Sequence, residues 1–323
     1  DSDLDPEQQA KRTAAKDKRV AERQRKVEIG LEELERWLRD LVRQGLAHAQ
    51  QQSARYWDGM AERLWDAQAR GLANWLRELA SIPASGEGWG ERLLAQLGSL
   101  YLLLEGHRRL DILPEPLRAD IRSRIGWSWQ EADLPADAWL RDRWLLVGQR
   151  GYEEEQMRVR RSWLWGRHHD RLALVLDFAH QSQPMPPMAA PGSWLEAELG
   201  FFPSEYPQRA LLRHAVAIED QEMPTGLADG AALLDRYAAA LARQPWLAVL
   251  PAAVAEALPV RRESDTWFLR DAAAKLLPCH PGFIDAWRLL ACSGGSPLTV
   301  FGEWNGQQFW PLSSWRDGQL TAF

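Results

Sequence analysis

The chain of 323 residues is about twice the length of a typical domain, and its 46% hydrophobic and 26% charged residues are ordinary for a folded globular protein. No apolar run approaches the roughly 20 residues that a membrane-spanning helix needs, and Asp1 opens a polar segment rather than a signal peptide, which favours a cytoplasmic protein. Two cysteines, Cys279 and Cys292, are too few for a disulfide framework and indicate reduced thiols. Because the first residue is not methionine, the sequence suggests that the numbering begins inside a longer product.

Charge is distributed unevenly along the chain. Between Gln8 and Val27 the basic residues outnumber Asp17 and Glu22 and give a net charge of +6, which leaves −12 for the rest of the chain. These basic residues are Lys11, Arg12, Lys16, Lys18, Arg19, Arg23, Arg25 and Lys26. Clustered lysines and arginines bind nucleic-acid phosphates, so all eight are candidate nucleic-acid contacts. A solvated connector is the interpretation that we favour, because no aromatic residue precedes Trp37 to stack on a base.

Tryptophan is the one strong departure from average composition, with 18 residues between Trp37 and Trp315. Rings of this size must be packed, so we expect most of them in the core and at interfaces. The alternative is a groove in which tryptophans stack on carbohydrate or on bases.

The first half of the chain has the pattern of a helical bundle. From about Gly30 to Leu46, apolar residues recur at helical spacing and form a broad stripe made of Ile29, Leu31, Leu34, Trp37, Leu38, Leu41, Val42 and Leu46. Further helices are predicted over residues 54–79, 91–104 and 116–125. We therefore expect a basic charged arm or linker over residues 1–28 and a helical domain over residues 29–150.

The second half has the pattern of an antiparallel sheet with a helical insertion. Strands are predicted over residues 160–165, 172–178, 193–202, 209–217, 266–270, 298–304 and 308–312. The turn Asn305–Gly306 is the strongest hairpin signal, because both residues tolerate positive φ. The helical insertion is predicted at about 227–258, in two helices over residues 227–242 and 246–258. The predicted class is therefore α+β, with all the strands in one sheet of a β-rich domain over residues 151–323.

Groups that could carry chemistry are few. His168, His169 and Asp170 have side chains of the kind that bind metals, but adjacent residues in a hairpin turn rarely converge on one ion, so we favour exposed turn residues. Cys279, His280 and Cys292 are a second candidate for zinc, with His214 or Asp285 as a fourth ligand, against the simpler interpretation of packed thiols. No catalytic residue, cofactor site or metal site is assigned.

Several stretches resemble a known family. They are Gly30–Leu46, Tyr56–Asp58 with Met60–Arg63, Gly86–Trp89 with Arg92–Ala95, Arg143–Leu145, Leu172–His180, Phe202–Pro207 and Val300–Trp304. Together they are similar to the region that follows the zinc finger in bacterial SWIM zinc-finger proteins. The family's finger uses Cys-x-Cys followed by Cys-x-His, and Cys279 and Cys292 are not spaced in that way. Zinc is therefore expected only in the family's finger, upstream of this chain, and no cofactor is expected within it.

The resemblance implies a biological context. In this family the full-length protein looks like a partner of MoxR-type AAA ATPases and von Willebrand factor A proteins that are encoded nearby, and its finger is implicated in binding nucleic acid or protein. The leading hypothesis is a non-enzymatic protein-interaction scaffold, which fits the excess of tryptophan. The alternatives are a nucleic-acid-binding accessory protein that uses the basic arm and the absent finger, and an enzyme whose site is dispersed in sequence.

Overall fold

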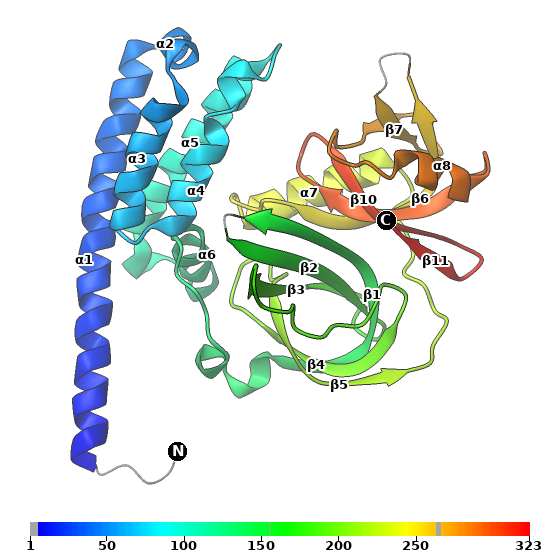
Figure 1. The fold of residues 1–323 in the computed structure, drawn as a ribbon, viewed down its shortest axis with the longest axis horizontal. Helices are drawn as coiled ribbons and strands as arrows, with labels where there is room; N and C mark the ends of the chain where they lie inside the picture. The colour runs from blue at the N-terminus through cyan, green and yellow to red at the C-terminus, as the bar shows by residue number, and fades with distance from the viewer. Residues whose placement is uncertain (1–5, 155, 263–265) are drawn as a thin grey trace. The chain divides into compact units, whose positions relative to one another are not determined.

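The structure, a computed structural model, describes residues 6–154, 156–262 and 266–323. It divides into two compact units, unit 1 over residues 1–128 and unit 2 over residues 129–323 (Figure 1). Unit 1 is helical and unit 2 contains two antiparallel sheets with helical insertions, which confirms the α+β class. The division lies before the junction at 150/151 that the sequence suggested. Within the described ranges, none of the helices combines the length and apolar character that a bilayer crossing requires.

Unit 1 is built from six α-helices and two short 3-10 turns in its described residues. They are α1 (Pro6–Gln44), α2 (Leu46–Gln51), α3 (Ala54–Asp66), α4 (Arg70–Leu79), η1 (Ile82–Ala84), α5 (Trp89–Arg108), η2 (Leu110–Ile112) and α6 (Glu115–Ile125).

The long helix α1 includes both the predicted helix and the segment expected as a separate arm. Its side chains are described at Ala15 and from Lys18 onward. Its core face is a stripe at three- and four-residue spacing formed by Val27, Leu31, Leu34, Leu38 and Leu41. Ile29 and Val42, which were expected on this stripe, are 50% and 57% exposed. At about 100° per residue, Ile29 falls nearly opposite the packed face and Val42 falls at its edge. The helix ends before Gly45, where a φ of 87° turns the chain.

The single helix predicted over residues 54–79 is wrong, since the structure has two helices there. Gln68 takes a φ of 62°, and the amide of Ala69 donates to the carbonyl of Leu64 at 2.8 Å, which ends α3. The continuous apolar pattern concealed this break because the helices contribute buried faces to the same core. These faces are Trp57, Met60, Ala61 and Leu64 in α3, and Leu72, Ala73, Trp75, Leu76 and Leu79 in α4.

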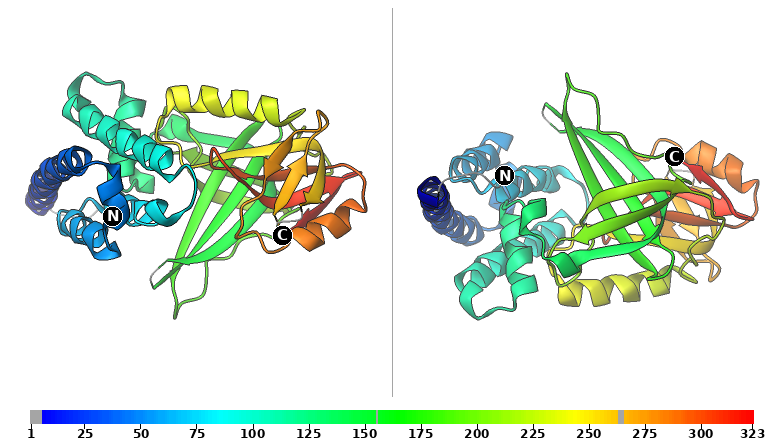
Figure 2. Two further views of the ribbon diagram at one scale, coloured as in Figure 1. Left: turned by 90° about the horizontal axis from the view of Figure 1, so that it is seen from above. Right: turned by 90° about the horizontal axis from the view of Figure 1, so that it is seen from below.

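The first sheet of unit 2 has the strand order β3-β2-β1-β4-β5. Its strands are β1 (Trp139–Glu154), β2 (Met157–Gly166), β3 (Arg171–His180), β4 (Trp194–Phe201) and β5 (Ala210–Ile218). A parallel bridge joins Leu174 to Arg209, and the amide of Leu174 donates to the carbonyl of Gln208 at 2.7 Å. These contacts bring β3 next to the start of β5, so the sheet curves around an interior that includes Trp144, Leu164 and Leu199 (Figure 2).

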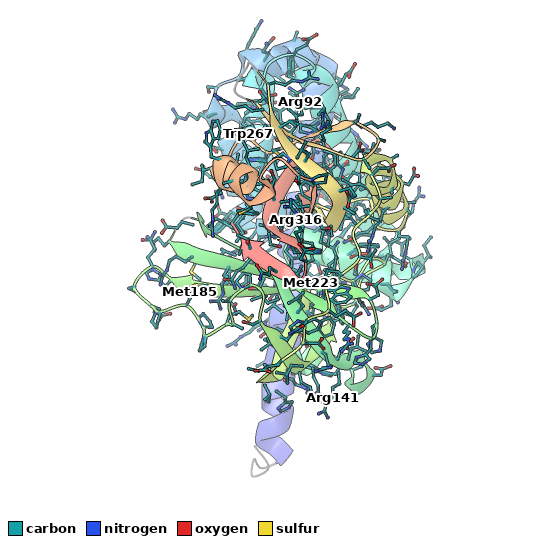
Figure 3. All side chains as sticks on the ribbon, turned by 90° about the vertical axis from the view of Figure 1, so that its right-hand side faces the viewer. Arg92, Arg141, Met185, Met223, Trp267 and Arg316 are labelled. Carbon is teal, nitrogen blue, oxygen red and sulfur yellow. The ribbon has the colours of Figure 1, made fainter. Side chains whose placement is uncertain are left out.

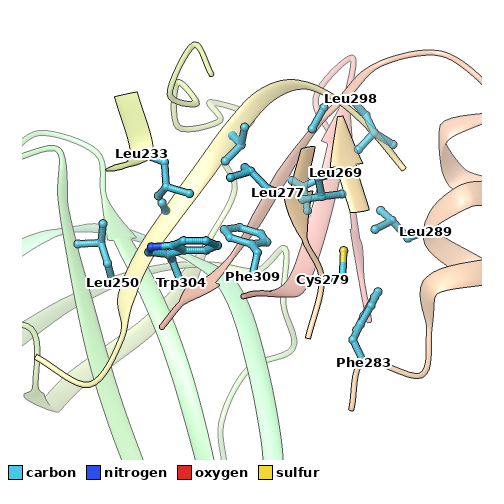
Figure 4. Packing of buried hydrophobic residues seen from close by; sticks show 14 of the residues in the cluster. Leu233, Leu250, Leu269, Leu277, Cys279, Phe283, Leu289, Leu298, Trp304 and Phe309 are labelled. Carbon is cyan, nitrogen blue, oxygen red and sulfur yellow. The ribbon is translucent and has the colours of Figure 1, made fainter. Parts of the chain in front are cut away.

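The second sheet has the order β11-β10-β9-β6-β7-β8. Its strands are β6 (Leu250–Arg261), β7 (Trp267–Arg270), β8 (Leu276–Pro278), β9 (Leu298–Trp304), β10 (Phe309–Arg316) and β11 (Gln319–Ala322), and α7 (Gly230–Arg243) and α8 (Ala286–Ser293) accompany them. The amide of His280 donates to the carbonyl of Phe309 at 2.8 Å, which brings the end of β8 back to β10. The core of the second sheet contains Trp304, Phe309 and Leu269, which pack with Leu233 of α7 and Leu289 of α8 (Figure 4).

The two sheets pack on each other through a separate apolar layer. Trp163 and Trp165 of β2 meet Phe301 of β9 and Leu312 of β10 in this layer. At the close approach, a side chain on Gly148 would bring its Cβ within 2.9 Å of the Leu312 Cβ, so only glycine fits there without a shift of the sheets. Gly148 also marks a bulge in β1, where the pairing with β2 changes register.

The prediction of one sheet is therefore wrong, because the strands around Trp163 and Trp304 lie in different sheets that pack face to face. The predicted helix over residues 246–258 is also wrong. That segment contains strand β6, in which Leu250 pairs with Trp304 and Pro251 pairs with Glu303. Its alanine-rich sequence favours a helix locally, but pairing with β9 and burial of Val254 and Ala257 decide its structure. The hairpin at Asn305–Gly306 is confirmed, with β9 and β10 on either side and a φ of 96° at Gly306.

Candidate functional site

The basic residues near the N-terminus lie on a helix. Four of them are exposed on α1: Lys18, Arg19, Arg25 and Lys26. At about 100° per residue, these four and Arg23 fall within one half of the helix circumference. Lys26 forms an ion pair with Glu22 at 3.4 Å. The side chains of Lys11, Arg12 and Lys16 lie outside the described residues, although their backbone belongs to α1.

Arg23 differs from its basic neighbours because it contacts the bundle. Its guanidinium lies 4.0 Å from the centre of the Trp127 ring, and its Nη2 donates to the carbonyl of Gly126 at 2.9 Å. Burial, and next the charge of Arg70, lower the pKa of Arg23. Sequence reasoning missed this partner because Trp127 lies more than a hundred residues later and no local pattern joins the two. Arg23 thus anchors the basic segment, and the other four described cations remain open to solvent.

The histidine pair His168–His169 is oriented by an aspartate from another strand, not by Asp170. The carboxylate of Asp142 pairs with Nδ1 of His168 at 2.6 Å and with Nδ1 of His169 at 2.7 Å, and it accepts the backbone amides of both residues. The Asp142 carboxylate is fully covered, whereas the His168 and His169 side chains are 63% and 46% exposed. Asp170 accepts instead from the indole nitrogen of Trp165 at 2.7 Å.

Electrostatics at Asp142 follow from these hydrogen bonds. Burial alone raises its pKa, but the bonds from His169, His168 and the backbone outweigh burial and hold the pKa below its usual range. Asp142 is therefore an ionised carboxylate that positions two imidazoles. Nothing in the local sequence marked Asp142, since it reaches the turn only through the pairing of β1 with β2.

The second set of predicted ligands does not assemble. Cys279 is buried in the second sheet, where burial raises its pKa to about 12, whereas Cys292 is exposed on α8. The ring of His280 lies 4.4 Å from that of Trp310, and Asp285 is at the N-cap position of α8 without a side-chain cap hydrogen bond. His214 belongs to β5 of the first sheet. Across the described ranges, no group of three or more His, Cys, Asp or Glu side chains is placed to hold a metal ion.

A buried glutamate joins the two sheets of unit 2. Glu303 of β9 is 4% exposed, and its Oε1 accepts from the indole nitrogen of Trp163 at 2.8 Å and from Nε of Arg161 at 2.8 Å. Both donors belong to β2, so this carboxylate connects strands of different sheets. Buried carboxylates are stable only with such partners, which makes this junction specific.

A small cavity lies beside this junction. Its volume is about 310 Å³, and its walls include Arg150, Tyr152, Arg161, His280, Glu303 and Trp310. The Arg150 guanidinium lies 3.9 Å from the centre of the Trp310 ring and 5.5 Å from that of Tyr152. Its Nη1 is 3.7 Å from Oε2 of Glu303, which is longer than a hydrogen bond.

An apolar and aromatic surface lies at α8. We call it the α8 surface and define it by Arg261, Trp267, Ile284 and Trp287. Trp287 is 59% exposed and Ile284 is 88% exposed, which is unusual for side chains of this size. The Trp267 and Trp287 rings meet edge to face at 5.0 Å, and the Arg261 guanidinium lies 5.1 Å from the Trp287 ring centre. Figure 3 labels Trp267 near α8.

Comparison with known proteins identifies part of unit 1. Residues 22–125 match the model of the SWIM-associated four-helix bundle domain, a range that runs from within α1 to the end of α6 and covers about a third of the chain. The resemblance noted in the helical region is thereby confirmed. No curated protein and no solved structure matches the chain significantly. The similar stretches in unit 2, such as Phe202–Pro207, lie outside the matched range.

Proposed function

We propose that this chain is a non-enzymatic protein-interaction scaffold and that the α8 surface is a docking site for a protein partner. The observation that carries the proposal is the exposure of Trp287, which lies beside Arg261, together with that of Ile284. Tryptophan and arginine are the residues most enriched among those that dominate binding energy at interfaces. Edge-to-face packing on Trp267 fixes the Trp287 ring, which reduces the entropy lost when a partner covers it.

The proposed partner follows from the SWIM-associated bundle of unit 1. Proteins of that family are expected to act with a MoxR-type AAA ATPase and a von Willebrand factor A protein, so these are the first partners to test. The chain catalyses no reaction in this scaffold role. The Asp142 cluster and the Glu303 junction are explained as structural connections between strands.

The test is direct binding of the purified full chain to the purified ATPase and to the purified von Willebrand factor A protein, by biolayer interferometry. Trp287→Ala should weaken binding about thirty-fold, because truncation of a central interface residue costs about 2 kcal/mol. Phe178→Ala is the matched control, since Phe178 is also an aromatic residue at 47% exposure but belongs to β3 of the first sheet. Equal affinities for the Trp287→Ala variant and the native chain would rule out the α8 surface.

A second function, nucleic-acid binding by α1, is favoured by the exposure of Lys18, Arg19, Arg25 and Lys26 on one half of that helix. Phosphate contacts of this kind release counterions, so the affinity for single-stranded DNA should fall steeply as salt is raised. Replacement of all four by glutamine should reduce the slope of log K against log salt by about 3. Unchanged salt dependence in this variant would exclude the basic segment as the binding surface.

A further inference from the structure

Arg150 is a half-buried cation whose charge is only partly matched inside unit 2. Oε1 of Glu303 is already shared by Arg161 and Trp163, and Oε2 lies 3.7 Å from Arg150 Nη1. The Arg150 guanidinium makes no hydrogen bond to another side chain among the described residues. Arg150 lines the adjoining cavity, so a ligand there can accept hydrogen bonds from its guanidinium.

The charge balance of the cavity also favours an anion. Arg150 and Arg161 carry two positive charges against the single negative charge of Glu303. Their side chains are 27%, 17% and 4% exposed, so water screens this excess poorly. Burial lowers the pKa of Arg150, with Glu303 opposing and Arg161 adding to that shift.

The aromatic walls fix the position of the guanidinium. Trp310 lies against Arg150 at 3.9 Å and against the His280 ring at 4.4 Å. Trp310 comes from β10, Arg150 from β1 and His280 from the segment after β8, so two strands and a loop set the geometry. The guanidinium lies over the indole ring, and the fork of a guanidinium suits a planar anion with two equivalent oxygens.

We propose that this cavity binds a carboxylate group, with Arg150 as its bidentate partner. A carboxylate matches the single excess positive charge, whereas a dianionic phosphate exceeds it. The volume of about 310 Å³ lies at the small end of ligand sites, so it suits a small organic acid or the terminal carboxylate of a peptide. The site lies apart from the residues that define the α8 surface and does not depend on the scaffold function.

Isothermal titration calorimetry of the full chain at constant ionic strength tests the proposal. The probes are benzoate, an N-acetylated tripeptide with a free carboxyl end, the same tripeptide as its amide, and inorganic phosphate. Binding of benzoate alone identifies a small-acid site, and binding of the free tripeptide but not of its amide identifies a peptide-end site. Either result supports the proposal. Binding of neither carboxylate, or tighter binding of phosphate, overturns it.

Variants locate the binding. Arg150→Gln should reduce the affinity for the carboxylate probe by about ten-fold or more. Arg150→Lys should also reduce this affinity, because an ammonium retains the charge but not the forked geometry of a guanidinium. Arg213→Gln is the matched control, since Arg213 lies 3.7 Å from the Trp139 ring centre and pairs with Glu198 on the same unit, outside the cavity. Thermal melting of each variant confirms folding. Unchanged affinity in folded Arg150→Gln overturns the assignment.

Discussion

Glu35 in unit 1 and Glu303 in unit 2 are both buried glutamates with two arginine neighbours, but their surroundings differ. Glu35 pairs with Arg39 at 2.5 Å and with Arg108, and these arginine side chains are 54% and 47% exposed. Glu303 lies among Arg150, Arg161 and Trp163, and its arginines are only 27% and 17% exposed. The arginines of Glu35 are therefore better solvated than those of Glu303. The helical unit thus depends mainly on apolar periodicity, whereas the two-sheet unit also depends on a polar junction between distant strands.

The largest expected effect of this difference is at Glu303. Glu303→Ala leaves the Arg161 guanidinium and the Trp163 indole nitrogen buried without their acceptor, so the free energy of unfolding of unit 2 should fall by about 3–5 kcal/mol. Urea denaturation followed by circular dichroism measures it. A loss below about 1 kcal/mol would show that water reaches the junction freely.

The corresponding change in unit 1 is Glu35→Ala. Because Arg39 and Arg108 stay about half exposed, the expected loss is smaller, about 1–3 kcal/mol, and should appear in the unfolding transition of the helical unit. Hydrogen exchange of amides in α1 and α5 assigns the transition. A loss as large as that at Glu303 would remove the contrast between the units.

Asp142 is expected to have an intermediate, pH-dependent effect. Its pKa is lowered in the folded protein, so its contribution to stability is present above the unfolded value of about 3.9 and is lost as pH falls through the folded value. Asp142→Asn should cost about 1–2 kcal/mol at neutral pH, since the imidazoles of His168 and His169 stay solvated. It should also flatten the acid limb of the stability curve. The free energy of unfolding of the variant and of the native chain is measured by denaturation at several pH values. Two parallel curves of free energy against pH would contradict the prediction.

The smallest change in the free energy of unfolding is expected for an arginine–glutamate ion pair that is exposed to solvent. Arg141 and Glu196 meet across β1 and β4 at 2.6 Å, but their side chains are 71% and 45% exposed. Glu196→Ala should change the free energy of unfolding by about 0–1 kcal/mol, because water solvates both charges. Urea denaturation in low and high salt checks it. A larger loss would mean that burial does not order these effects.

The sequence predicted the elements whose patterns are local. The predicted apolar stripe and the turn at Asn305–Gly306 are each contained within one segment. The turn is confirmed, and the stripe is confirmed at Leu31, Leu34, Leu38 and Leu41. The break at Gln68 and the strand at Leu250–Arg261 were missed because tertiary packing overrides local helix propensity there. Two sheets were not predicted because strand patterns do not specify pairing partners.

The candidate site residues were likewise predicted where their signal is local and missed where it depends on distant parts of the chain. His168 and His169 were found from their residue types, but their partner Asp142 lies 26 residues before His168 and belongs to a neighbouring strand. The junction of Glu303 with Arg161 spans 142 residues and has no signal in the sequence. The exposure of Trp287 could not be distinguished from burial, since tryptophans are expected mostly in cores.

The scaffold function is tested most directly by hydrogen–deuterium exchange of the full chain with and without the purified MoxR-type ATPase. We expect slower exchange in the described residues of the segment from Arg261 to Ser293, which contains the α8 surface, with little change in the first sheet. Protection confined to α1, or no protection anywhere at saturating ATPase, would contradict it.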